Sequence, residues 1–234
     1  EVFQFKGFDW KKRYDSPRAR DLFRKHAQQY LQQGGFIEVQ EPSLGMSRQI
    51  LQSYVDTVVF RDIVERYHIT QIAFVKYLIK TLVKGTGTFF SVNKFYNDIK
   101  SQGLRVGKNT IHEYLGYIED AYLNFSIPIY TESLRKQHSN PRKIYCIDPG
   151  LATAYSFQSN QNWGHLFETT VYLDIRRKGH QIHYYKTAAG FEVDFVSVSP
   201  AGKRFLFQVC FDTESEDTHQ RELRALKAAE KELK

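Results

Sequence analysis

Cysteine and methionine are scarce in this sequence: it has two cysteines, Cys146 and Cys210, and one methionine, Met46. Two cysteines are too few for a disulfide framework or a thiolate metal cluster, and such scarcity is typical of a reducing compartment. The sequence also lacks the run of about 18 apolar residues that a membrane span requires, and its N-terminus shows no signal peptide. We therefore expect a cytoplasmic protein with no membrane partner.

The residues that are abundant are those of an ordinary globular protein. Apolar residues make up 41% of the 234, with 15 Tyr and 18 Phe among the aromatic ones, which excludes disorder as the state of the whole chain. A formal charge of +7 permits an acidic partner such as DNA but does not require one. Because the chain opens with Glu1 and its one methionine is internal, we expect a fragment of a longer protein.

Helical spacing dominates the first third of the chain. Ser16 and Pro17 suit a helix start, apolar residues then recur at helical spacing, and Gly34 ends the pattern. The expected elements are a short strand at 3–10 without a partner nearby and further helices over about 48–67 and 70–83. We assign 1–68 to the end of an upstream domain and a helical connector.

The runs between 69 and 148 follow the order of a winged helix-turn-helix domain. The expected elements are helices over about 70–83, 91–103 and 108–120, followed by strands at 122–130 and 142–148. In that fold the second helix of the close pair presents its N-terminal residues to the DNA major groove. The stretch Gly103–Thr110 resembles a phosphate loop, but a helix precedes it instead of a strand, so we expect no ATP site there.

Basic and polar residues lie where a winged helix contacts DNA. The expected contacts are Arg105, Lys108 and Asn109 at the start of the second helix, with Arg135, Lys136, Arg142 and Lys143 around the connection between the strands. The alternative is that the fold serves as a protein–protein adapter and the basic residues form a solvated face.

Carboxylates mark the last third of the chain. A helix is predicted over 163–179 and strands over 181–187, 190–198 and 203–211. Alternation along the strands puts Asp194, Gln208 and Cys210 on one side, and Glu168 joins them if the helix packs across that side. Such oxygen ligands hold Mg²⁺, so Glu168 and Asp194 are candidate metal ligands, and a metal there would activate water against a phosphodiester. The alternative is that Asp194 and Glu192 simply lie exposed along a strand edge.

This order of residues resembles the PD-(D/E)xK, or restriction-endonuclease-like, superfamily. Glu168, Asp194 and Gln208 match its acidic helix residue, its hairpin Asp and the first position of its E/Q-x-K strand. Cys210 stands where the resemblance implies a catalytic lysine, and a thiol offers no fixed positive charge. Lys186 or Lys203 would have to supply the ammonium instead.

Nearly the whole chain resembles the C-terminal half of prokaryotic and archaeal-type AAA+ ATPases. The segments that carry the resemblance are "YLQQGGFIEV", "LQSYVDTVVFRDIVERY", "NTIHEYLGYIEDAYL", "RKIYCIDPGLA", "GHLFETTVYLDI" and "GFEVDF". The resemblance implies an α+β protein with a helical connector at 1–68, a winged helix at 69–148 and a restriction-endonuclease-like domain with a mixed sheet at 149–234. It places ATP and Mg²⁺ in a missing N-terminal ATPase domain.

Three functions are compatible with these features. The first is a regulatory, DNA-binding module of such an ATPase, with a nuclease-like domain that lacks full activity. The second is a Mg²⁺-dependent DNA endonuclease that uses Glu168, Asp194 and Gln208. The third is a protein–protein interaction module, which includes a homo-oligomer; the acidic run after Cys210 favours it slightly because negative charge repels DNA.

Overall fold

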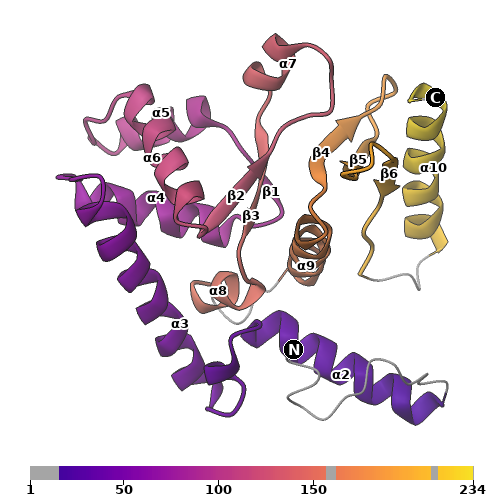
Figure 1. Ribbon diagram of the computed structural model, residues 1–234, viewed down its shortest axis with the longest axis horizontal. Helices are drawn as coiled ribbons and strands as arrows, with labels where there is room; N and C mark the ends of the chain where they lie inside the picture. The colour runs from indigo at the N-terminus through magenta and orange to yellow at the C-terminus, as the bar shows by residue number, and fades with distance from the viewer. Residues whose placement is uncertain (1–15, 157–161, 212–215, 234) are drawn as a thin grey trace.

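A computed structural model describes residues 16–156, 162–211 and 216–233. The fold is α+β, with many helices and two three-stranded antiparallel sheets (Figure 1). The strand expected at 3–10 lies outside the described residues. Within them, no helix combines the length and the apolar character needed to cross a bilayer.

The first helices form where the sequence indicates. Helix α2 (Pro17–Gln33) has Ser16 as its cap, because the Ser16 hydroxyl accepts a hydrogen bond from the Ala19 N–H, and it stops at Gly34, whose φ is 82°. After a short 3-10 turn (Ile37–Val39), helix α3 (Leu44–Val58) continues into a π-helical stretch (Val59–Glu65). Helix α3 starts before the predicted residue 48 because the Ser43 hydroxyl caps it.

The next segment combines three helices with a sheet. Its elements are α4 (Ile72–Lys84), β1 (Thr88–Phe90), α5 (Val92–Ser101), α6 (Lys108–Asp120), β2 (Asn124–Ile127), α7 (Leu134–Ser139) and β3 (Arg142–Cys146). The strands lie in the order β1-β3-β2, and both pairs are antiparallel. Strand β1 and helix α7 were not predicted: β1 is too short to show alternation, and α7 forms in a polar stretch because Ser133 caps it.

The largest core lies beneath these helices. It is mainly aliphatic and draws on α3, α4, α5 and α6 with side chains such as Leu51, Leu78, Ile99, Ile111 and Ile118, all nearly inaccessible to solvent. Burial of this many branched side chains is the principal stabilising contribution to the first segment.

The last segment begins with helix α8 (Pro149–Ala154). The remaining elements are α9 (Trp163–Arg177), β4 (Gln181–Lys186), β5 (Glu192–Val198), β6 (Arg204–Phe207) and α10 (Glu216–Glu232). Although the sequence assigned 149–154 to the third domain, α8 packs against α2 and α3. Helix α9 contacts β3, β4 and β5, and α10 packs against β5 and β6 on the outer side (Figure 1).

The second sheet differs from the prediction in two ways. Its strands, in the order β4-β5-β6, are all antiparallel, because tight turns connect them, so the expected mixed sheet is wrong; the one parallel contact in the described residues is a bridge between Ile129 and Tyr184. A bulge also interrupts the counted alternation: His183 pairs with Val196 but Tyr185 pairs with Val193, so an extra residue of β5 is accommodated there.

The two sheets join at their edges through the chain that follows β2. The Tyr130 N–H donates to the Tyr184 carbonyl at 2.7 Å, and the Tyr184 N–H donates to the Pro128 carbonyl at 3.1 Å. A shared apolar cluster lies behind this junction, in which Phe125 and Tyr145 of the first sheet pack with Tyr172 of α9 and Phe195 of β5. The segment that forms the first sheet and the segment that forms the second sheet therefore share one core at this junction.

A buried lysine among three carboxylates

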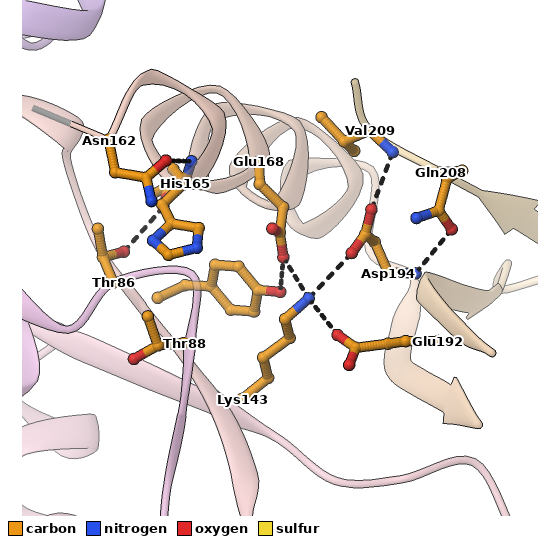
Figure 2. Close-up of polar contacts among 12 residues, drawn as sticks. Thr86, Thr88, Lys143, Asn162, His165, Glu168, Glu192, Asp194, Gln208 and Val209 are labelled. Atoms are coloured by element: carbon orange, nitrogen blue, oxygen red, sulfur yellow. Dashed lines mark hydrogen bonds and ion pairs between the residues drawn. The ribbon is translucent and has the colours of Figure 1, made fainter. Parts of the chain in front are cut away.

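Lys143 of strand β3 lies at the centre of a group of carboxylates from the other sheet and from α9. Its Nζ is 2.8 Å from Glu168 Oε1, 2.9 Å from Glu192 Oε1 and 2.9 Å from Asp194 Oδ1 (Figure 2). The Tyr145 hydroxyl donates a further hydrogen bond of 2.6 Å to Glu168 Oε1. We call these five side chains the Lys143 cluster.

Nearly all of the Lys143 cluster is closed to solvent. The exposed fractions are 4% for Lys143, 7% for Glu168 and 8% for Asp194, whereas Glu192 is partly exposed. Burial of charges is costly unless each is paired and hydrogen-bonded, and here every carboxylate has the ammonium as a partner. With all three carboxylates ionised, one ammonium leaves an excess of negative charge.

The pKa values follow from this balance. Burial alone lowers the pKa of Lys143, but the carboxylates of Glu168, Asp194 and Glu192 outweigh it and raise the pKa, so the ammonium stays charged. Burial raises the pKa of Glu168 to about 7, with Lys143 opposing the shift and Asp194 adding to it. Burial, and next the charge of Lys143, lower the pKa of the nearby His165. Glu168 is therefore the group that can take up a proton near neutral pH.

Local side-chain bonds replace the sheet ladder at the end of β6. Asp194 Oδ2 accepts from the Val209 N–H at 2.9 Å, and the Asp194 N–H donates to Gln208 Oε1 at 3.3 Å (Figure 2). Gln208 also donates to Glu222 Oε2 of α10 at 2.6 Å. These bonds explain why β6 ends at Phe207 rather than at the predicted residue 211.

The bulge in β5 orients Asp194. The Asp194 side chain points to Lys143. The next residue, Phe195, packs on the same side, and its ring centre lies 5.6 Å from that of Tyr145 and 6.3 Å from that of Tyr172. Consecutive residues of a regular strand point to opposite faces. The irregular register is what allows one carboxylate and one core aromatic to face β3 together.

The arrangement does not fit Mg²⁺ between Glu168 and Asp194 as it stands. The Lys143 ammonium lies within hydrogen-bond distance of both carboxylates, in the position that a cation shared by them would take. Gln208 directs its oxygen to the backbone of Asp194, and no group of three or more His, Cys, Asp or Glu side chains in the described residues is arranged to hold a metal. Metal binding would require Lys143 to move.

Neither of the lysines that the sequence offered as replacements lies in the cluster. Lys186 is exposed, with its ammonium 4.7 Å from the centre of the Phe89 ring, and Lys203 is exposed beside the Phe205 ring at 5.2 Å. The ammonium beside Glu168 and Asp194 comes from Lys143, 67 positions before Cys210 in the numbering. Its one sequence signal is that the apolar strand residues 144–146 follow it directly.

Six of the seven expected nucleic-acid contacts are on the surface. Arg105, Lys108, Asn109, Arg135, Lys136 and Arg142 are all exposed. Lys108 donates to Asn93 Oδ1 at 2.7 Å, and Arg142 donates to Ser126 Oγ at 3.2 Å. Lys143 is the exception: as an alternate residue of β3 it points inward, so its assignment to the basic surface is corrected here.

The geometry thus defines a class: an α+β protein whose two sheet-containing segments are joined by a shared core and a buried ion cluster. The chain belongs to the family of the domain of unknown function DUF8612, whose model matches residues 24–162. Residues 163–234 match the model of a second domain of unknown function, DUF4143. Lys143 and Tyr145 come from the first match, and the three carboxylates come from the second.

Two relatives show how far the similarity extends. An uncharacterized protein of Methanocaldococcus jannaschii is 31% identical over 238 residues, which covers 100% of this chain and 52% of the relative. An uncharacterized protein of Haemophilus influenzae is 26% identical over 216 residues, covering 92% of this chain and 53% of the relative. The chain therefore spans about half the length of these relatives. No solved structure matches it.

Proposed function

We propose that this chain is a DNA-binding, regulatory module of a longer protein, in which the nuclease-like carboxylates are held by Lys143 and do little or no cleavage. The observation that carries the proposal is the exposure of basic side chains in two groups. One group, Arg105 and Lys108, lies at the start of α6, and the other, Arg135, Lys136 and Arg142, lies around α7 and the start of β3. Exposed lysines and arginines bind phosphates by releasing counterions.

The order of elements supports a winged-helix interpretation of the first segment. Helices α4, α5 and α6 are interleaved with strands whose sheet order is β1-β3-β2, as expected for a helix-turn-helix with a strand pair attached. On this interpretation α6 is the helix that enters the major groove, with Lys108 and Asn109 in its first turn.

The order α9-β4-β5-β6-α10 supports a restriction-endonuclease-like interpretation of the second segment. Substrate access is what argues against efficient cleavage. A scissile phosphate would have to reach carboxylates that are 7% and 8% exposed and already bonded to an ammonium. We therefore propose a binding role for this segment in the cytoplasm, as part of the same module.

About half of each relative lies outside the match to this chain, and a second activity can reside there. In keeping with the resemblance to AAA+ ATPases, we propose that ATP and Mg²⁺ act in the part of the full-length protein beyond this chain. That domain would be the principal partner of this module, and a second copy of the chain is a further partner in this proposal.

Salt-dependent DNA binding tests the proposal. Fluorescence anisotropy with a labelled DNA duplex should show affinity that falls as salt rises, and Lys108→Ala or Arg142→Ala should reduce the slope of log K against log salt by about 1 each. Lys227→Ala, which removes an exposed lysine of α10, is the matched control and should leave the slope unchanged. Absence of binding at low salt would refute the proposal and favour a protein–protein interaction module.

A Mg²⁺-dependent endonuclease is the second candidate, and Lys143 is the observation that favours it. Its ammonium lies beside Glu168 and Asp194, where the sequence appeared to lack one at Cys210. Nicking of supercoiled plasmid in Mg²⁺ or Mn²⁺ distinguishes the two functions. Nicking that disappears in Asp194→Ala, in a variant that still binds DNA, would establish the nuclease; equal results with both proteins favour the binding module.

A further inference from the structure

A groove runs along the side of α6 between the two basic groups. It has a volume of about 310 Å³, within the size range of small-molecule sites. Its walls come from α6, from the β1–α5 junction and from the chain between α7 and β3. We call it the α6 groove.

The α6 groove has both apolar and polar side chains in its walls. His112, Leu115, Gly116 and Glu119 line it from α6, and their spacing puts them along one side of the helix, where Leu115 also packs against the core that contains Ile111. Phe90 and Ile144 supply apolar surface from the sheet. Gly116 has nothing within 4 Å of the position of a β-carbon, so the groove is open along this part of the helix.

A fixed carboxylate lies in this groove. The Ser126 hydroxyl donates to Glu119 Oε1 at 2.5 Å, and Arg142 donates to the same hydroxyl at 3.2 Å. The guanidinium therefore orients the carboxylate through Ser126. A carboxylate next to a DNA backbone is repelled by the phosphates unless it accepts hydrogen bonds from a base.

Among the bases, guanine fits a carboxylate acceptor best. Its pairing edge carries two adjacent N–H donors, the ring N–H and the exocyclic amino group, which can both be directed at one carboxylate. Cytosine, adenine and thymine place an acceptor next to a donor on that edge, and the acceptor would face the carboxylate oxygen. Since pairing in a duplex uses this edge, only an unpaired base can offer it.

We propose that the α6 groove binds a single unpaired guanine of a DNA strand, with Glu119 as the acceptor for its pairing edge. Phe90, Leu115 and Ile144 offer apolar surface to the base, and Arg142, which also lines the groove, is placed to bind a flanking phosphate. This inference rests on the proposed DNA binding and adds a base preference to it.

Anisotropy with three labelled DNAs tests the proposal: a paired duplex, the same duplex with one bulged guanine, and the same duplex with one bulged thymine. The bulged-guanine DNA should bind about 10-fold more tightly than the other two, the discrimination expected of a two-point base contact. The thymine bulge controls for the flexibility that any bulge introduces.

Two variants with matched controls locate the effect. Glu119→Gln should abolish the preference for guanine, whereas Glu113→Gln, on an exposed side of the same helix, should keep it. Gly116→Leu should fill the α6 groove and remove the preference, whereas Gly45→Leu, at another open glycine on α3, should not.

The outcomes separate this inference from the function it rests on. Equal, salt-dependent binding to all three DNAs overturns the guanine site and leaves the DNA-binding proposal intact. An equal increase in affinity for the guanine and thymine bulges also overturns it, because Glu119 then does not distinguish the two bases. No binding to any of the three overturns both.

Discussion

The two sheets are alike in size and pairing but differ in the charge that they bury. The sheet β1-β3-β2 contributes the one ammonium of the Lys143 cluster, and β4-β5-β6 contributes Glu192 and Asp194, with Glu168 added from α9. Loss of the charge on one side, with the other side still buried, would leave unpaired ions in an apolar environment, which costs several kcal/mol per ion. The junction between the two family matches, at residues 162 and 163, therefore does not separate two independent cores.

The aliphatic core of the first segment is different in kind. It consists of uncharged side chains, most of them from α3 to α6, that pack against one another. Such a core tolerates exchange of similar side chains, whereas the Lys143 cluster depends on particular atoms at hydrogen-bond distance. Mutations should therefore distinguish the two regions sharply.

Removal of the cluster cation should have the largest effect. Lys143→Met keeps an apolar side chain of similar length but leaves the carboxylates without their partner, so we expect a loss of about 3 to 5 kcal/mol in the free energy of unfolding. Urea denaturation measures it. Lys186→Met, an exposed lysine nearby, should change the same quantity by about 0.5 kcal/mol or less. Equal effects of the two variants would show that the cluster does not join the segments.

The pH dependence should come next in size. Burial raises the pKa of Glu168 to about 7 from its ordinary value of 4.5. Between these two pH values the folded state keeps a proton on Glu168 that the unfolded state has lost. Stability from this group is fully present below the unfolded pKa and is lost as pH rises through 7, a change of about 3 kcal/mol at most. Urea titrations at pH 5 and pH 8 should show it.

Glu168→Gln is the control for that pH dependence, because the amide does not titrate. A smaller dependence of the same sign should survive in this variant, since burial also raises the pKa of Asp148 to about 6. The side chain of Asp148 accepts from the Gly35 N–H at 2.6 Å and the Gly150 N–H at 2.7 Å, and among the described residues it makes no hydrogen bond to the Lys143 cluster. An unchanged pH dependence in Glu168→Gln would contradict the assignment to Glu168.

The edge junction should give the smallest effect. The hydroxyl of the buried Tyr184 donates to the carbonyl of Pro141, the residue before β3, at 2.8 Å, so Tyr184→Phe removes one hydrogen bond and should cost about 1 kcal/mol. Tyr185→Phe is the matched control, since that hydroxyl bonds to Glu232 of α10 at an exposed position. Thermal denaturation measures both variants. A greater loss of stability in Tyr185→Phe than in Tyr184→Phe would contradict this prediction.

Local signals in the sequence predicted most of the helices. Ser16 with Pro17, and Ser91 ahead of α5, mark helix starts because their hydroxyls accept from nearby N–H groups, as observed. The strands were predicted with less accuracy. β1 has too few residues to show a pattern, and β6 ends early because Asp194 and Gln208 bond to the neighbouring backbone, which alternation does not report.

The candidate site shows the same division. The pattern of Glu168, Asp194 and Gln208 indicated that these side chains come close, and the structure does bring Glu168 and Asp194 to the same ammonium and Gln208 to the Asp194 backbone. The identity of that ammonium was missed. Lys143 was grouped with the surface residues Arg142 and Lys136 because it is their neighbour in sequence, although neighbours on a strand point in opposite directions.

The α+β composition, the positions of most helices and the approach of Glu168 to Asp194 follow from the sequence, because caps, periodicity and alternation act over a few residues. Tertiary structure decided which cation meets those acids, because Lys143 reaches Asp194 across 51 positions of the chain only when β3 packs against α9 and β5. A buried charge selects its partner by distance in space, and distance in sequence carries no information about that choice.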